Sequence, residues 1–444
     1  MKTSSIFLYF ILPYFVFGQN VNIPDANFKS YLIANSEINT NGDNEIQISE
    51  ASSFAGEIYC FDQQILDLTG IEAFTSLTSL NCSSNMLTNI DVSQNTELLN
   101  FDCSMNMLTS LDLSDNNILR FLNCELNQLT DLNVSFTNAL IVLECGGNEL
   151  TTLDVSSNAD LEFLECYYNQ LTSLYVDGAD ALKELYCYEN DLASLDVASN
   201  SALEVLECHY NQLTSLYSEG VDALIYLNCS NNQLSILSLN GAPALTKLYC
   251  GFSSLTSLDI GMNTALTELY CSHTLLTDLN LSNNAALEIL NCEASQLTSL
   301  DVSANFELRY LVCNYNQITS LDLSSNIALS DLLCVFNDLT CLNIANGMND
   351  NLNNLAAYNN PSLTCIQVDD ATWSSENWLL IDSQTSFSEN CNNECTSSLI
   401  EITTSKNLIQ ILDLMGCETS FKPNTPLIYV YDDGSIEKVF SVEY

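Results

Sequence analysis

Basic residues are scarce in this sequence. It has 9 Lys and Arg against 56 Asp and Glu in 444 residues, which gives a formal net charge of −47. A nucleic-acid-binding protein needs clustered Lys and Arg to neutralise phosphates, so this class is excluded. The same shortage argues against docking on an anionic membrane surface. Cations and neutral or basic partners remain open, as does the alternative that the acidic residues only keep the protein soluble.

Histidine is also rare. His209 and His273 are the only two, and neither has a nucleophile and an acid at the spacing of a catalytic motif. The motifs GxSxG and HExxH and a phosphate-binding loop are all missing. Pairs of carboxylates are common, but chance alone produces them in a chain this acidic. The sequence therefore predicts a protein that is not an enzyme, and a carbohydrate-active enzyme is the least favoured alternative.

A long apolar run occurs only at the beginning of the chain, in MKTSSIFLYFILPYFVFGQN. Lys2 precedes the apolar residues 6–17, and the small residue Gly18 follows them. This pattern is typical of a secretory signal peptide, here residues 1–18, with Gln19 as the first mature residue. No later stretch is long enough to span a bilayer, so we expect an exported protein without a transmembrane segment.

Cysteine is abundant and regularly spaced. Leu or Phe stands two residues before each repeated cysteine, and Leu or Ile stands five and eight residues after it. Asn stands three residues after the cysteine in ten of thirteen units, and the unit reads LxxLxCxxNxLTxLDVSxNxx. The cysteines recur every 21 residues at Cys82, Cys103, Cys124, Cys145, Cys166, Cys187, Cys208, Cys229, Cys250, Cys271, Cys292, Cys313 and Cys334.

The unit has the pattern of one coil of a solenoid. Leu80 and Cys82 are two residues apart, so they share one face of a short strand. Asn85 follows where the chain turns, and its amide can satisfy backbone groups there. Leu87, Ile90 and Val92 return as a second extended segment. One such unit cannot bury its apolar face alone, whereas stacked units can.

This repeat resembles the leucine-rich-repeat family, in a bacterial 21-residue class with LxxLxC followed by LxxLDV. The resemblance covers about residues 58–345. It implies a repeat solenoid that is mainly β, a right-handed coil with a parallel sheet on its concave side, and a binding role rather than catalysis. A divergent turn precedes the array, and its stretch 67–77 is expected to be helical on the convex side.

The repeated cysteines occupy a core column where Leu usually stands, so they are interpreted as small buried hydrophobic residues. A zinc site is excluded because neighbours in one flat column cannot surround a metal tetrahedrally. The segment 346–395, which contains Trp373 and Trp378, is expected to cap the array. The sequence allows a disulfide in this region without determining its pairing. The cysteines outside the ladder are Cys341, Cys365, Cys391, Cys395 and Cys417.

An N-terminal cap is expected over residues 19–57, and part of it resembles an EF-hand loop. In NTNGDNEIQISE, Asn39, Asn41 and Asp43 occupy the first, third and fifth positions. Glu45 would contribute its carbonyl at the seventh position, and Glu50 would be the bidentate twelfth ligand of Ca²⁺.

Two positions depart from the EF-hand pattern, since Asn39 replaces the usual Asp and Asn44 replaces the turn glycine. Helical segments are nevertheless expected on both sides of the loop, with one before it and another over residues 49–54. The first is indicated by the spacing of Phe28, Tyr31 and Leu32. The alternative is a polar turn that belongs to the N-terminal cap and binds no metal.

The C-terminal segment 396–444 has a different pattern. Residues 427–431 and 436–442 flank Asp-Asp-Gly-Ser, which predicts a β-hairpin. The string ILDLMGCET…PLIYVYDDGSIEKVF resembles the C-terminal sorting domain of type IX secretion substrates in Gram-negative bacteria. This resemblance implies delivery to the outer cell surface by the type IX secretion machinery. Cys417 stands where that family commonly has Arg, and the alternative is a small β cap that only finishes the solenoid.

Residues beside each cysteine are expected to face outward from the concave sheet, and in the middle coils they become aromatic and acidic. Tyrosine offers a large contact area with a polar tip, which suits recognition of protein or glycan. The alternative is that the rings only stabilise the sheet by stacking. The predicted ligand-binding residues are Glu165, Tyr167, Tyr168, Tyr186, Tyr188, Glu189, Glu207, His209, Tyr210, Tyr249 and Tyr270.

These observations predict a secreted or cell-surface protein that binds or adheres through its concave face. A structural spacer without a specific ligand is the main alternative. The pattern does not identify the ligand.

Overall fold

The computed structural model describes residues 19–391, 395, 408–412, 426–431 and 436–440. The chain divides into two compact units, Met1–Cys395 and Thr396–Tyr444. The predicted signal peptide and Cys417 lie outside the described residues. Within the described part of the chain, no helix has the length and apolar character needed to cross a membrane.

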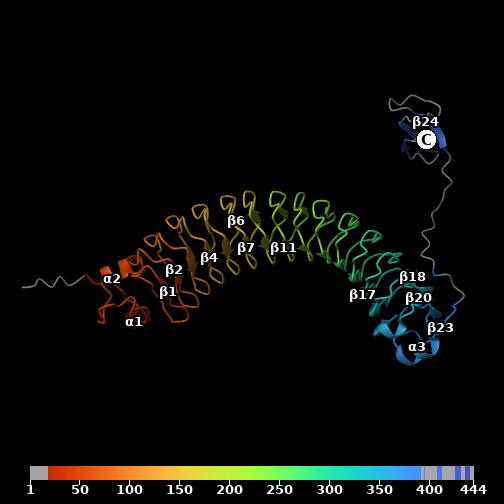
Figure 1. The fold of residues 1–444 in the computed structure, drawn as a ribbon, viewed down its shortest axis with the longest axis horizontal. Helices are drawn as coiled ribbons and strands as arrows, with labels where there is room; N and C mark the ends of the chain where they lie inside the picture. Colours follow the sequence, from red (N-terminus) through yellow and green to blue (C-terminus); the bar gives the residue numbers. More distant parts are fainter. Residues whose placement is uncertain (1–18, 392–394, 396–407, 413–425, 432–435, 441–444) are drawn as a thin grey trace, which may run out of the picture. The chain divides into compact units, whose positions relative to one another are not determined.

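The first unit is a solenoid in which each coil contributes a three-residue strand to one parallel sheet, called here the long sheet (Figure 1). Partner residues of neighbouring repeat strands are 21 apart, as in Leu80 with Phe101 and Leu206 with Leu227. The predicted fold class, a leucine-rich-repeat solenoid with a parallel concave sheet, is therefore confirmed. Its fifteen strands are β1 (Glu57–Tyr59), β2 (Ser79–Asn81), β3 (Asn100–Asp102), β4 (Phe121–Asn123), β5 (Val142–Glu144), β7 (Phe163–Glu165), β9 (Glu184–Tyr186), β11 (Val205–Glu207), β13 (Tyr226–Asn228), β14 (Lys247–Tyr249), β15 (Glu268–Tyr270), β16 (Ile289–Asn291), β17 (Tyr310–Val312), β19 (Asp331–Leu333) and β21 (Asn354–Ala356).

The returning arm of the coil forms shorter parallel sheets. The predicted end of the array at residue 345 falls between β20 and β21, so the segment expected as a cap carries further strands. Two of these sheets have two strands each, β6 (Thr152–Asp154) with β8 (Ser173–Tyr175) and β10 (Ser194–Asp196) with β12 (Ser215–Tyr217). A third sheet has four strands, β18 (Ser320–Asp322), β20 (Cys341–Asn343), β22 (Cys365–Gln367) and β23 (Ser386–Ser388).

The cysteine column lies in the solenoid core beside the leucines of the long sheet. Leu206 and Cys208 are both fully buried, and the fourteen described cysteines from Cys60 to Cys334 in this column are buried and free. Burial raises the pKa of the thiols, to about 12 for Cys187 and Cys229. The interpretation of these residues as small core hydrophobes is confirmed.

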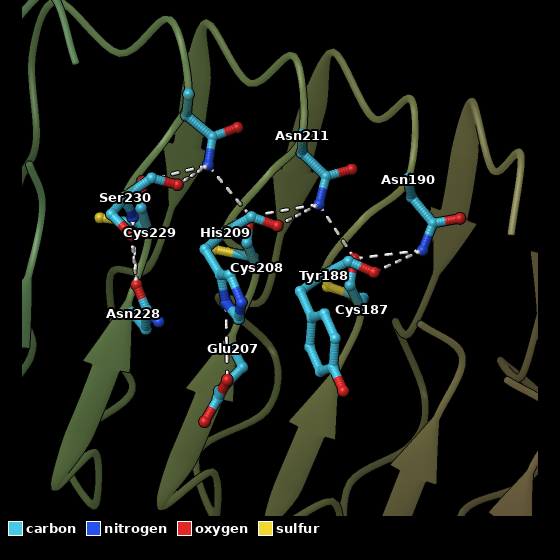
Figure 2. A network of polar contacts seen from close by, with 11 residues as sticks. Cys187, Tyr188, Asn190, Glu207, Cys208, His209, Asn211, Asn228, Cys229 and Ser230 are labelled. Carbon is cyan, nitrogen blue, oxygen red and sulfur yellow. Dashed lines mark hydrogen bonds and ion pairs between the residues drawn. The ribbon is translucent and has the colours of Figure 1, made fainter. Parts of the chain in front are cut away.

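The asparagine three residues after the cysteine, present in ten of the thirteen repeat units, joins consecutive coils, and we call this column the asparagine ladder (Figure 2). The Asn211 side-chain NH₂ donates to the carbonyl oxygens of Cys187 and Cys208 at 2.9 and 3.1 Å. Its Oδ1 accepts from the Leu192 backbone N–H at 3.0 Å. Buried backbone groups at the turn are thereby satisfied across the boundary between coils.

A second asparagine column lies on the other side of the core. The Asn200 side chain donates to the carbonyl oxygens of Val176 and Ala179 at 3.0 and 2.9 Å. Its Oδ1 has no hydrogen-bond partner, and the same is true along the column. The other members with this unpaired oxygen are Asn95, Asn116, Asn158, Asn263, Asn284, Asn305 and Asn326.

The N-terminal cap contains the two predicted helices, α1 (Ala26–Ala34) and α2 (Ile48–Ser53). Asp25 caps α1 by accepting from the backbone N–H groups of Asn27 and Phe28, and its other oxygen accepts from Leu66 of the first coil. The expected helix over 67–77 is wrong in extent. Only the 3₁₀ turn η1 (Ile71–Ala73) forms there, because Gly70 adopts a left-handed conformation and the rest of the stretch follows the coil path.

The C-terminal end of the solenoid is closed by η2 (Asn349–Asn351), α3 (Ala371–Asn377) and two disulfides. Cys341 pairs with Cys395, and Cys365 pairs with Cys391. Trp378 is buried, and its indole N–H donates to the Leu352 carbonyl oxygen at 3.1 Å. These contacts replace the coil that would otherwise cover the last turn of the core.

In the second unit, the predicted hairpin is confirmed. The strands β25 (Pro426–Tyr431) and β26 (Ile436–Phe440) pair antiparallel, and β24 (Leu408–Leu412) adds to the other edge of β25.

The burial of the ladder thiols predicts their reactivity. In the folded protein, a thiol reagent should leave Cys60 through Cys334 unmodified, because the sulfur atoms are buried and the thiolate is disfavoured. All fourteen should react after unfolding in denaturant. Mass mapping of native and unfolded samples measures this, and disulfides between consecutive ladder cysteines would contradict it.

Candidate functional site

The outward face of the long sheet is built by the residues immediately before and after each cysteine. Strand residues alternate between faces, so these positions point away from the core that holds the cysteine. The residues after the cysteine are small in the first coils, as in Ser83 and Ser104. In the coils of Cys166, Cys187 and Cys208 they are rings. We define the aromatic band as Tyr167, Tyr168, Tyr186, Tyr188, His209 and Tyr210.

Three rings of the band form a continuous stack. The ring centroids of Tyr167 and Tyr188 are 4.8 Å apart, with 6° between the ring planes. Those of Tyr188 and His209 are 4.6 Å apart, with 13° between planes. Figure 2 shows Tyr188 and His209 side by side on neighbouring coils, near the asparagine ladder. The strand spacing of about 4.8 Å sets the distance between the rings.

Tyr167 extends this stack toward the preceding coils. Its hydroxyl donates to Glu125 Oε1 at 2.8 Å, although Glu125 is 42 residues earlier and thus two coils away. The coil between them has Gly146 in the same column, and a Cβ there would lie 3.0 Å from both Glu125 Oε1 and the Tyr167 ring. The missing side chain therefore leaves room for this contact.

Tyr168 and Tyr210 are the exposed rings of the band, with 54% and 55% of their surface accessible. Both adopt a positive φ, at 50° and 51°, which turns their side chains outward at the end of the strand. Tyr168 packs edge-on against Tyr188, and Tyr210 packs edge-on against His209. Hydrogen bonding to Glu189 raises the pKa of Tyr168. The predicted residue Glu189 therefore lies at the edge of the band, beside Tyr168.

Tyr186 lies on the strand side of the band, with its ring centroid 5.5 Å from that of Phe163. Its hydroxyl donates to Glu184 Oε2 at 2.7 Å. Phe163 and Glu184 stand three residues before their cysteines, a column that faces the same side of the sheet as the residue before the cysteine.

Tyr249 and Tyr270 belong to a different cluster. Their rings stack at 4.6 Å, and Tyr226 packs beside Tyr249 at 5.5 Å. The Tyr249 hydroxyl donates to Glu268 Oε2 at 2.8 Å. In the column after the cysteine, Ser230 and Gly251 follow His209, so the three-ring stack ends there. Of the eleven predicted residues, six form the aromatic band, and Tyr249 and Tyr270 lie beyond it. The remaining three, Glu165, Glu189 and Glu207, stand in the same coils as the band.

Carboxylates border the aromatic band, and burial raises the pKa of three of them. Burial, with repulsion from Glu125 and Glu144, raises the pKa of Glu165 to about 7. Burial also raises the pKa of Glu144 and of Glu207. His209 Nδ1 is 3.5 Å from Glu207 Oε2, and burial lowers the pKa of His209, which disfavours the charged imidazolium.

Three contributors to this face were not predicted from the sequence: Glu125, Gly146 and Phe163. Glu125 and Tyr167 are far apart in the sequence, so their contact was not predicted. The 21-residue register could have predicted it, because Glu125, Gly146 and Tyr167 occupy one column of the repeat.

The EF-hand-like loop is closed by its own hydrogen bonds. Glu50 Oε1 accepts from the Thr40 and Asn41 backbone N–H groups at 2.9 and 3.2 Å, and Oε2 accepts from Gln47 N–H at 3.0 Å. The Asn39 side-chain NH₂ donates to the Asp43 carbonyl oxygen at 2.7 Å. Both Glu50 oxygens are thus committed to N–H donors, and this arrangement does not fit a bidentate ligand.

The other residues of the loop predicted as ligands also make side-chain contacts within the cap, although the predicted ligand atom of Glu45 is its carbonyl oxygen. The Asn41 NH₂ donates to Asp43 Oδ2 at 3.1 Å, and the Glu45 carboxylate pairs with Lys29 at 2.8 Å. Among the described residues, no group of three His, Cys, Asp or Glu is placed to hold a metal ion. Calcium binding, which would also involve amide and carbonyl oxygens, stays a prediction.

The substitution Glu50→Gln separates the two roles of this loop. Loss of the capping carboxylate should lower stability by about 1 kcal/mol even in chelator. Under the calcium proposal, Ca²⁺ should raise the melting temperature of the unsubstituted protein but not that of the variant. Differential scanning calorimetry in Ca²⁺ and in chelator measures both effects. Identical melting of the unsubstituted protein in the two buffers would contradict calcium binding.

The stacked coils, the long parallel sheet and the 21-residue register define a leucine-rich-repeat solenoid with a cysteine core column. Within this class the chain is similar to internalin J. The solved functional domain of InlJ from Listeria monocytogenes, which includes a cysteine ladder, is 27% identical. The alignment covers 96% of this chain and 99% of that domain, with a TM-score of 0.63.

The other comparisons are more limited. The curated Internalin J of Listeria monocytogenes serotype 4b (strain F2365) is 40% identical over 74 residues, which are 16% of this chain and 8% of that protein. The chain therefore matches only a small part of this relative's length. The internalin inlF of Listeria monocytogenes 4b F2365 shares the fold, with 21% identity, a TM-score of 0.58, and coverage of 69% of this chain and 94% of its own. No protein-family model matches the chain.

Proposed function

We propose that this protein binds a protein or glycan through the aromatic band, as an adhesion or recognition protein at the cell surface. The observation that carries the proposal is the gathering of six rings from three consecutive coils on one face of the long sheet. The coils on either side have Glu, Gly, Ser or Asn in the same columns and keep the same fold, so the rings are not needed to form the sheet. Tyrosine-rich surfaces of this kind are typical of binding sites.

A spacer without a ligand explains this distribution less well. Ring stacking would serve a spacer equally along its whole length, whereas the aromatic columns here are interrupted by Asn228 and Ser230. Tyr168 and Tyr210 also have large exposed surfaces at a strained backbone conformation, which is easier for Gly or Asn. The solenoid itself does not require these two rings.

The aromatic band can be removed with residues that other coils already use in the same columns. Ser104 and Ser230 stand in the column of Tyr167 and Tyr188, Asn228 in that of Tyr186, and Asn231 in that of Tyr210. The variant is Tyr167→Ser, Tyr188→Ser, Tyr186→Asn and Tyr210→Asn. It should keep the fold and lose the ligand found with a glycan array or a surface-protein pull-down, because aromatic hot spots contribute about 2 kcal/mol or more each.

A matched control changes the returning arm of the coil. Asp112, Asp154, Asp196 and Asp259 each accept one backbone N–H two residues ahead. Asn133 and Asn280 do the same in other coils, so Asp→Asn at all four positions preserves the turn. This control should bind normally. Loss of binding in the control with retention in the aromatic variant would place recognition outside the band.

We propose further that the chain is exported by its N-terminal signal peptide and sorted to the surface of a Gram-negative bacterium by the type IX secretion machinery. The support is the sequence pattern of residues 1–18 and the resemblance of residues 396–444, which form a unit separate from the solenoid.

Truncation tests the sorting proposal. Removal of residues 405–444 should leave a folded solenoid, because the strands described within this segment pair with one another and none of them joins the long sheet. The truncated protein should not reach the cell surface, as measured by immunolabelling of intact cells. Normal surface delivery would contradict a sorting role.

A further inference from the structure

The carboxylates beside the aromatic band have no Lys or Arg partner. We define the carboxylate row as Glu125, Glu144, Glu165 and Glu207, which stand immediately before or after their cysteines. Within the described part of the first unit, no Lys or Arg stands immediately before or immediately after a ladder cysteine. Those in the solenoid stand three or four residues before it, at Arg120, Lys183, Lys247 and Arg309. Three of them pair with glutamates of their own columns, Glu162, Glu268 and Glu288.

The carboxylate row is concentrated rather than dispersed. Glu144 and Glu165 are directly paired residues of the adjacent strands β5 and β7. Both are half-buried, and repulsion from Glu125 adds to burial in raising the pKa of each. Glu144 accepts from the Asn123 amide at 2.5 Å and Glu125 accepts from Tyr167, but neither partner carries a compensating charge. A cation placed here would therefore relieve an unfavourable interaction.

The exposed rings complete the site for such a cation. Tyr168 and Tyr210 stand at the turn beside the row, and Tyr168 has Glu189 next to it. An ammonium or guanidinium group can lie on an aromatic face while a nearby carboxylate accepts its N–H donors. Burial lowers the pKa of His209, which disfavours a positive charge on this ring that would oppose the cation.

The row also has the length of a short peptide. It extends over five coils, from that of Cys124 to that of Cys208, or about 19 Å at the strand spacing of about 4.8 Å. An extended chain covers this distance in about six residues, at about 3.3 Å each. The side chains of such a segment could reach both the row and the exposed rings.

We propose that the partner of the aromatic band is an extended protein segment rich in Lys or Arg, which lies along the carboxylate row. This inference rests on the proposed function, because it names the ligand class of the same face. The partner's basic side chains would pair with the row, and its aliphatic stems would pack on Tyr168 and Tyr210. A neutral glycan would leave the carboxylates without a partner, so the observations favour the basic segment.

The test uses the full-length purified chain and a fluorescein-labelled peptide of four Arg-Gly repeats, with four Ser-Gly repeats as the neutral probe. The row variant is Glu125→Gln, Glu144→Gln, Glu165→Gln and Glu207→Gln, which keeps side-chain size and acceptor oxygens. The four Asp→Asn changes of the returning arm remove at least as much charge from another column. Binding is measured by fluorescence anisotropy at 150 mM salt, which weakens diffuse attraction, and circular dichroism checks that each variant is folded.

We expect the Arg-Gly peptide to bind the unsubstituted chain and the Ser-Gly peptide not to bind. The row variant should weaken binding by about tenfold or more, while the control should change it less than about twofold. The pair Tyr168→Gly and Tyr210→Asn should also weaken it, by about fivefold, through loss of cation–π contacts. Gly147 and Asn231 already occupy that column, so these changes suit the backbone.

Equal weakening by the row variant and the control would overturn the proposal, since binding would then depend only on total charge. Absence of binding to the Arg-Gly peptide would overturn it as well. If a ligand from the array or pull-down requires the tyrosines but binds the row variant normally, the proposed function holds and the basic-segment proposal fails. If no ligand requires the tyrosines, the proposed function itself fails.

Discussion

The asparagine ladder is the interaction on which this solenoid depends. A coil of 21 residues turns sharply after each strand, and the turn leaves backbone groups inside the protein without partners in their own coil. One Asn side chain supplies donors to two carbonyl oxygens and an acceptor to one N–H, and these groups belong to consecutive coils. The ladder holds neighbouring turns in register, and in three coils Ser253, Thr274 and Ser295 use a hydroxyl donor in the same column. The columns of the repeat therefore become continuous lines of side chains on both faces of the sheet.

The binding face follows from that register. Rings that are 21 residues apart in sequence come to stacking distance without any contact specific to aromatic residues, and Tyr167 reaches Glu125 only because the column contains Gly146 between them. Ser, Gly, Glu and Tyr all occur in these columns in different coils of the same scaffold. A solenoid of this kind can therefore change its ligand by substitution along one column, while the core columns of Leu, Cys and Asn stay the same.

The 21-residue period predicted the parallel sheet, the buried cysteines and the turn asparagines, because each depends on a pattern repeated many times. Single features were harder to predict. The disulfide pairing depends on how residues 346–395 fold back, and the stretch 67–77 has a helical composition but follows a coil already shaped by its neighbours. At the candidate site, the ring columns could be predicted, whereas the raised pKa of Glu165 results from burial and neighbours on other coils.

The two ends of the array are closed by different chemistry. Both disulfides lie at the C-terminal end, and no cysteine precedes Cys60 at the other. In a linear stack, each coil is stabilised mainly by the next one, so loss of order spreads inward from whichever end opens first. Under oxidising conditions, the end expected to open first is the N-terminal one, where the cap of α1 and α2 is held only by noncovalent contacts. We therefore expect thermal fraying to be directional and to reach the first coils before the aromatic band, because covalent links protect the opposite end.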